Sequence, residues 1–211
     1  MRAFPATLLL TALLPALIGV LPAQVIEFEN NGLRYQTLTR GAVTVMYAHI
    51  PAPTKDYDVL QVAVSNGSKV PWIVKPEDFA FRRKDGTVVK PEPPRIVVGK
   101  FLDKASRNDV IKLLTTYEAT LYGLTRIQST NGYEQRRQQM LGELTSAKIK
   151  AAAAASVIAF VQAKLKAGES TDGAMFFAVG NGKALGAGRL EVNTAGERFE
   201  FLSEDGGKVL Q

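Results

Sequence analysis

Residues 57–66 read YDVLQVAVSN, and this segment is the clearest indication of the fold. Leu60, Val62 and Val64 point to one side of an extended chain, whereas the residues between them point to the other side. The turn sequence NGS follows at residues 66–68. Alternation of this kind, closed by a turn, predicts a β-strand that has one face in an apolar core.

Other predicted strands lie on both sides of this segment. Residues 42–50 are almost continuously apolar, which is typical of a strand that is covered on both faces, and residues 175–179 (MFFAV) form a second buried run. Shorter runs rich in β-branched and aromatic residues, separated by turn residues, lie at residues 25–28, 33–39, 70–74, 79–82, 189–193 and 198–202. Strands at this spacing predict an antiparallel β-sandwich.

Between residues 103 and 166 the hydrophobic period changes to that of a helix. Apolar residues at 110–124 fall on one stripe of an amphipathic helix, and the sequence STNG at 129–132 is typical of a turn between helices. A second stripe predicts a helix over residues 132–166, with a bend expected at Gly142. The segment therefore predicts a two-helix hairpin.

Residues 59–86 resemble the immunoglobulin-like domains of many secreted bacterial proteins. The resemblance lies in VAVSNGS at 62–68, PEDFAF at 76–81 and the pair DG at 85–86. Residues 165–177 (LKAGESTDGAMFF) resemble a later strand of the same group, although Ala167 stands where a proline is frequent. The resemblance implies a mostly β fold, an immunoglobulin-like antiparallel β-sandwich, into which the helical hairpin is inserted. It implies no catalytic residues.

The first 23 residues are typical of an export signal. Arg2 precedes an uncharged apolar stretch, and Ala23 offers a small residue for cleavage. Three prolines and the short apolar length argue against a membrane-spanning helix. We therefore expect export to the bacterial periplasm or the extracellular space. The expected parts are a signal peptide at 1–23, the first part of the sandwich at 24–102, the helical hairpin at 103–166, the remaining strands at 167–202 and a polar tail at 203–211.

Composition argues against several kinds of active site. The 211 residues include no cysteine and one histidine, so there is no disulfide, no thiolate nucleophile and no cysteine or histidine-rich metal centre. A serine triad would have to use His49, and no serine has the Gly-x-Ser-x-Gly context. The glycine-rich sequence GNGKALGAG at 180–188 precedes a strand rather than a helix, which favours hairpin turns over a phosphate loop. We expect no enzymatic activity, cofactor or metal.

The formal net charge of +6 is unevenly distributed along the chain. Residues 103–166 hold 10 basic and 5 acidic residues, whereas the predicted sandwich segments are together neutral. The predicted helices contain no run of adjacent basic residues longer than the pair of arginines at 136–137 and no alternation of aromatic and basic residues, so we expect no nucleic-acid partner. An anionic partner is therefore expected at the helical segment.

Residues 148–166 read KIKAAAAASVIAFVQAKLK, an apolar stretch of 13 residues with two lysines at each end. The stretch is too short to span a bilayer. Its alanine face is expected to pack against the first helix; other uses are a membrane interface with anionic headgroups or a surface for a protein partner. The candidate interaction residues are Lys148, Lys150, Ile158, Phe160, Lys164 and Lys166.

We therefore expect a non-catalytic binding, scaffolding or assembly module of the bacterial cell envelope, with a protein partner. The alternative is a peripheral membrane protein that acts through the lysine-flanked helix. The oligomeric state stays open.

Overall fold

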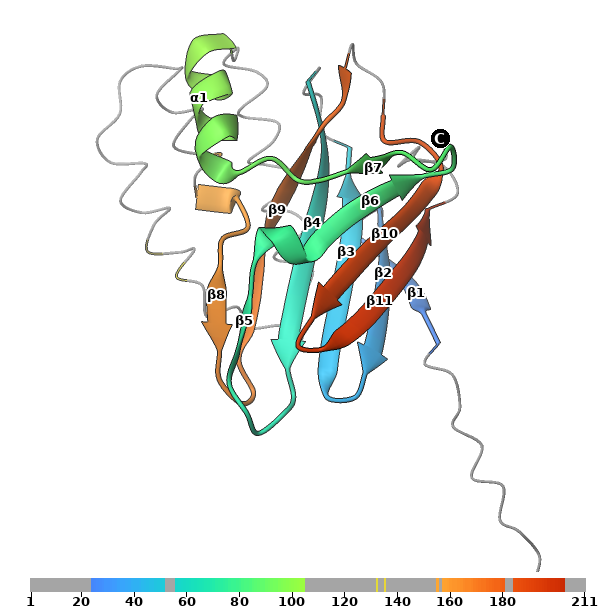
Figure 1. Cartoon of the computed structure of the whole chain (residues 1–211), viewed down its shortest axis with the longest axis vertical. Coiled ribbons are helices and arrows are strands. Elements are labelled where there is room, and N and C mark those ends of the chain that lie inside the picture. Colours follow the sequence, from blue (N-terminus) through green and yellow to red (C-terminus); the bar gives the residue numbers. More distant parts are fainter. Residues whose placement is uncertain are drawn as a thin grey trace, which may run out of the picture.

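The structure is a computed structural model, and it describes residues 24–51, 56–104, 157–180 and 184–203, together with Gly132, Gln135 and Ala155. These residues form mostly antiparallel β-sheet, as expected (Figure 1). Residues 1–23, which carry the predicted export signal, and most of the predicted helical hairpin lie outside the described residues. The signal and the hairpin therefore stay predictions.

The larger sheet has five strands in the order β1-β2-β3-β4-β9, and we call it the large sheet. Strand β4 pairs with β3 on one side and with the edge strand β9 on the other, so Val64 lies between Val45 and Thr171. The strand bounds are β1 (Ile26–Asn30), β2 (Leu33–Arg40), β3 (Val43–Ile50), β4 (Tyr57–Asn66) and β9 (Ser170–Ala178).

A second antiparallel sheet has the order β11-β10-β6-β7, and we call it the charged sheet after its outer face. It consists of β6 (Phe79–Arg83), β7 (Val88–Val89), β10 (Gly188–Thr194) and β11 (Glu197–Ser203). A short two-stranded ribbon joins β5 (Trp72–Val74) to β8 (Ala163–Leu165), and we call it the β5–β8 ribbon. The remaining elements are the short 3-10 helix η1 (Pro76–Asp78) and the helix α1 (Pro94–Lys104).

The two sheets enclose one apolar core. Alternate residues of β4, β6, β10 and β11 point into it, and its members include Val62, Phe81, Val192 and Phe201. The rings of Tyr47 and Phe201 lie 5.2 Å apart in an edge arrangement, which joins the two layers. The alternation in residues 57–66 and 189–202 thus predicts the buried faces correctly.

The outer face of the large sheet is also buried. Val97 and Phe101 of α1 pack in one cluster with Val59 and Phe176 of the sheet. At the edge of this sheet the chain pairs with β9, where the backbone N–H of Phe160 donates to the carbonyl oxygen of Ala174 at 2.8 Å, and the Phe160 side chain joins the core between the sheets. Residues 43–50 are mostly buried on both faces, as expected for the run at 42–50, and the buried strand predicted at 175–179 is also confirmed.

The helix predicted over residues 132–166 is wrong at its C-terminal end. Residues 157–158 are helical, Ala159 forms a bridge with Ala174, and β8 is a strand paired with β5. Helix propensity here is overridden by pairing with β5 and by burial of the Phe160 side chain, whose ring lies 5.5 Å from that of Phe79. Helix α1, in turn, lies almost wholly within the part where only strands are expected, with Pro94 at its first position.

Candidate binding site

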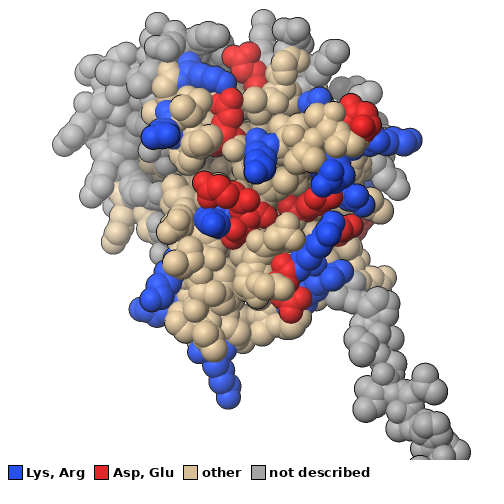
Figure 2. Space-filling view, viewed as in Figure 1, with Lys and Arg blue, Asp and Glu red and all other residues tan. Residues whose placement is uncertain are grey.

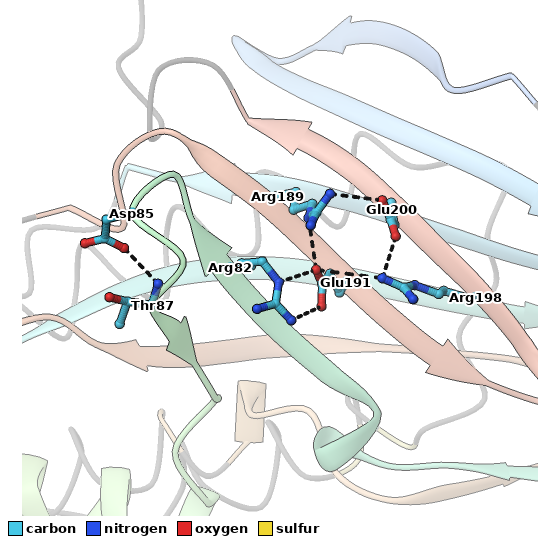
Figure 3. A network of polar contacts seen from close by, with 7 residues as sticks. All are labelled: Arg82, Asp85, Thr87, Arg189, Glu191, Arg198 and Glu200. Carbon is cyan, nitrogen blue, oxygen red and sulfur yellow. Dashed lines mark hydrogen bonds and ion pairs between the residues drawn. The ribbon is translucent and has the colours of Figure 1, made fainter.

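The outer face of the charged sheet carries arginines and glutamates in alternation with the core residues. Leu190 and Val192 point into the core, so Arg189 and Glu191 point outward from the same strand. Figure 2 shows blue and red atoms interspersed over the front of the molecule, where β6, β10 and β11 lie in Figure 1. Figure 3 shows the side chains that meet there.

Glu191 is the centre of this network. Its carboxylate accepts hydrogen bonds from Arg82 Nε at 2.7 Å and Arg82 Nη2 at 3.1 Å, and from Arg189 Nε at 2.9 Å (Figure 3). Only 8% of the Glu191 side chain is exposed. The hydrogen bond from Arg82 is the largest of the interactions that hold the pKa of Glu191 below its ordinary value. The carboxylate is therefore ionised at neutral pH and fixes two guanidinium groups.

Glu200 lies directly opposite Glu191 in the pairing of β10 with β11. Two carboxylates in such positions repel each other unless cations separate them. Here Arg198 Nη2 lies 2.7 Å from Glu200, and Arg189 Nη1 lies 3.5 Å from the same carboxylate (Figure 3). Three arginines therefore surround two glutamates, and the network keeps a net positive charge.

A hollow of about 580 Å³ adjoins this network at one end of the charged sheet. Its lining includes four cationic side chains, and none of the described residues that line it is acidic. The volume is within the usual range for sites that bind small molecules. We call it the basic hollow, and the lining residues that matter here are Arg82, Arg83, Lys84, Arg189, Leu202 and Ser203.

The rim of the hollow is held by backbone hydrogen bonds between two distant segments. Lys84 N–H donates to the carbonyl oxygen of Ala187 at 3.0 Å, and Arg83 N–H donates to that of Thr87 at 2.8 Å. Asp85 accepts the Thr87 N–H at 2.8 Å, and this hydrogen bond is the main cause that lowers the pKa of Asp85 (Figure 3). Arg83 and Lys84 therefore belong to a turn whose backbone is held by hydrogen bonds.

Two further features belong to residues that line the hollow. Arg83 Nε is buried and has no hydrogen-bond partner in the part of the chain that the structure describes. Gly188 brings the backbone close to β6, because a Cβ there would meet the carbonyl oxygen of Arg82 at 2.4 Å. The arrangement can bind a carboxylate, sulfate or phosphate group.

His49 is paired with a residue that the sequence analysis did not connect to it. Its Nε2 lies against the Asp58 carboxylate, and Asp58 also accepts the N–H of Leu185 at 2.7 Å. The pair therefore joins β3 and β4 to the segment before β10. Among the described residues no group of three or more histidine, aspartate or glutamate side chains could hold a metal ion. A structural role for the pair accounts for both contacts.

The six interaction residues expected from the sequence do not form one surface. Ile158 and Phe160 are each 1% exposed, so the expectation that they face a partner is contradicted by their packing in the core. Lys164 and Lys166 are exposed on β8 and directly after it. Lys148 and Lys150 lie outside the described residues.

The basic hollow was not found from the sequence because its lining comes from three separate segments. Residues 82–84 (RRK) are the one local signal, and Arg189 and Ser203 reach the hollow only through the pairing of β10 with β6 and β11. Strand pairing over such distances is not visible in local patterns.

No protein-family model matches the chain, and no curated protein matches it. Among solved structures, the chain is similar to the yjhA protein from Bacillus subtilis, with 11% identity and a TM-score of 0.32. That similarity covers 80% of this chain and 77% of the other. None of the described helices is long and apolar enough to cross a membrane.

Proposed function

We propose that this protein is an exported, non-catalytic binding module of the bacterial cell envelope, built as an immunoglobulin-like sandwich. Its partner presents an anionic group to the basic hollow. The observation that carries the proposal is the lining: four cationic residues line a hollow of about 580 Å³, and none of the described lining residues is acidic. The sequence pattern of residues 1–23 supports export, and two antiparallel sheets around one core support the sandwich.

The network around Glu191 gives the hollow its geometry. Arg82 and Arg189 line the hollow, and both are also held by the Glu191 carboxylate. A guanidinium that is already fixed loses little conformational freedom when an anion binds. Arg83 and Lys84 form no ion pair with a described residue, although the charge of Arg83 also acts on the nearby Asp85 carboxylate. Guanidinium groups that are held in place, beside cations without an ion pair, favour the binding of a planar or tetrahedral oxyanion.

The alternative of a membrane-binding helix at residues 148–166 has less support. Ile158 and Phe160, the two large apolar residues expected to enter the interface, are 1% exposed. A helix whose large apolar residues pack in the core has little apolar surface left for lipid. We therefore place the anionic partner at the basic hollow rather than at this helix.

Calorimetric titration of the full chain with inorganic phosphate, sulfate and acetate tests the proposal. Saturable binding at one site is expected, and R83Q/K84Q should weaken it at least tenfold because two cations are removed from the lining. K90Q is the matched control, because Lys90 is an exposed lysine that does not line the hollow. Equal binding by the wild type and R83Q/K84Q would contradict the proposal.

A further inference from the structure

Two apolar side chains flank the arginines on the outer face of the charged sheet. Arg189 of β10 lies directly opposite Leu202 of β11 on one side and opposite Arg82 of β6 on the other. Arg82 in turn lies opposite Val88 of β7. Directly opposed residues of neighbouring strands point to the same face of a sheet. The four side chains therefore form one row over strands that lie side by side in Figure 1, and we call it the cross-strand row.

Both ends of the cross-strand row are open to solvent. Leu202 is 69% exposed and Val88 is 43% exposed, whereas the residues beside them in the chain, Phe201 and Val89, pack in or against the core. Isolated exposed aliphatic side chains are common on protein surfaces. These two differ, because each lies one strand away from an arginine and both arginines lie between them. The row therefore presents two cations with an apolar group on either side.

The middle of the row keeps a positive charge. A guanidinium has five N–H donors. Glu191 accepts hydrogen bonds from two nitrogens of Arg82 and from one of Arg189, and Glu200 accepts one more from Arg189 (Figure 3), so both arginines keep donors for another acceptor. The polar network and the adjoining turn contain five basic and three acidic side chains, which are Arg82, Arg83, Lys84, Arg189 and Arg198 with Asp85, Glu191 and Glu200. The excess of two positive charges favours an anionic group over the row.

The spacing of the row defines the shape of the ligand that fits it. Neighbouring strands lie about 4.8 Å apart, so about 14 Å separates the two apolar ends of the row. In an extended peptide, alternate side chains point to one side and repeat about every 6.7 Å. The side chains of residues i, i+2 and i+4 therefore span about 13 Å. Such a peptide can place one apolar side chain at each end of the row and an acidic side chain over the two arginines.

We propose that the cross-strand row binds an extended peptide segment in which an acidic residue stands between two apolar residues, each two positions away. The acidic side chain accepts hydrogen bonds from guanidinium donors of Arg82 and Arg189 that do not bind Glu191, and the apolar side chains pack on Leu202 and Val88. A fatty acid or a phospholipid carries its anion at one end of its apolar part, so it would cover only one end of the row. The inference names the partner of the basic hollow and rests on the function proposed above.

NMR titration of the full chain with acetylated and amidated pentapeptides tests the inference. The peptide LSESL is expected to bind, with shift changes at the backbone amides of Leu202 and Val88. The peptide LSQSL lacks the charge and SSESS lacks the apolar side chains, and each should bind about tenfold more weakly than LSESL. Inorganic phosphate is titrated in parallel, because it reports the anion site without the apolar contacts.

Val88→Ser is the most informative variant, because Val88 does not line the basic hollow. It should weaken the binding of LSESL about fivefold and leave the binding of inorganic phosphate unchanged. Val70→Ser is the matched control, since Val70 is 68% exposed and lies outside the row, and it should bind LSESL as the wild type does. Both positions are exposed, so both variants should fold, which circular dichroism verifies.

The outcomes separate this inference from the function on which it rests. Equal affinity for LSESL and SSESS, equal affinity for LSESL and LSQSL, or undiminished binding of LSESL by Val88→Ser would each overturn the inference. Phosphate binding that is weakened in R83Q/K84Q would still support the proposed function in all three cases. Tighter binding of decanoate than of LSESL would assign the row to an acyl-chain anion and would also overturn the inference. Binding of neither phosphate nor LSESL would overturn both proposals.

Discussion

The outer faces of the two sheets differ completely in character. On the large sheet Ala48, Val59 and Phe176 are buried, and α1, Ala155 and residues 157–159 cover part of the face. On the charged sheet the equivalent positions carry arginines and glutamates that meet solvent (Figure 2). An apolar face has to be covered, because water penalises its exposure, while a charged face can remain open. The charged sheet is therefore the face that is available to a partner.

Contacts at the edge of the covered face show how α1 is held. Tyr57 donates a hydrogen bond to Glu92 at 2.6 Å, and Lys100 of α1 lies 2.7 Å from the same carboxylate. Burial first, and the bond to Glu92 second, raise the pKa of the Tyr57 hydroxyl, so it stays protonated and keeps donating. On this face polar side chains bind helix α1 to the sheet. On the charged sheet the polar side chains form ion pairs with one another.

The largest expected effect is a difference in the free energy of unfolding between a substitution on the covered face and one on the open face. Phe176→Ala removes a buried ring that contacts the rings of Tyr57 and Phe101, and it should lower the free energy of unfolding by about 3–5 kcal/mol. Leu202→Ala on the outer face of β11, where the side chain is 69% exposed, should change it by about 0.5 kcal/mol or less. Urea denaturation measures both. Similar losses in the two variants would mean that the faces do not differ as described.

A second pair of variants tests how closely the chain at Phe160 lies against the edge strand β9 of the large sheet. A Cβ at Gly173 would meet the Phe160 Cα at 2.5 Å, so Gly173→Ala should destabilise the fold by about 1–3 kcal/mol. Gly99, in the middle of α1, has no atom within 4 Å of such a Cβ, and Gly99→Ala should stabilise the protein by up to about 1 kcal/mol. Thermal unfolding should therefore move in opposite directions. A Gly173→Ala protein as stable as the wild type would contradict the close packing.

The smallest expected effect concerns the charged network. Glu191→Gln should lower the stability at neutral pH by about 1 kcal/mol, because Arg82 and Arg189 lose an ionised partner that is mostly buried. Glu200→Gln, at a carboxylate that is 38% exposed, should cost less. Chemical denaturation at several pH values provides the measurement.

The pH dependence of that difference has a definite sign. The folded pKa of Glu191 is lowered, so its contribution to stability is complete above about pH 4.3 and is lost as the pH falls through the folded pKa. The wild type should therefore lose its advantage over Glu191→Gln in acid. An advantage that grows on acidification would contradict the role given to this carboxylate.

The contrast between the faces is largely predictable from the sequence. Alternation of Leu190 and Val192 with Arg189 and Glu191 indicates one buried and one polar face, and the continuous apolar run at 175–179 indicates burial on both. The structure confirms both inferences through the core clusters. Burial depends on local pattern, and local pattern is what a single sequence contains.

Two features required information that local pattern does not contain. Residues 163–165 continue an alanine-rich helical pattern, yet they pair with Trp72–Val74 because β5 offers a free edge beside them. The basic hollow is assembled from the end of β6, the start of β10 and the end of β11. Both depend on which distant strands pair. The net charge of each segment, which is most positive in the helical segment, does not show where basic residues from different strands meet.

The most direct test of the open charged face is an NMR titration of backbone amides in the full chain with inorganic phosphate. We expect the shift changes to concentrate at residues 82–87 and 187–189, which line the basic hollow or form its rim, and to leave β3, β4 and β9 unchanged. In the R83Q/K84Q variant these changes should be lost. Changes spread evenly over the surface, or centred on the covered face of the large sheet, would contradict the account.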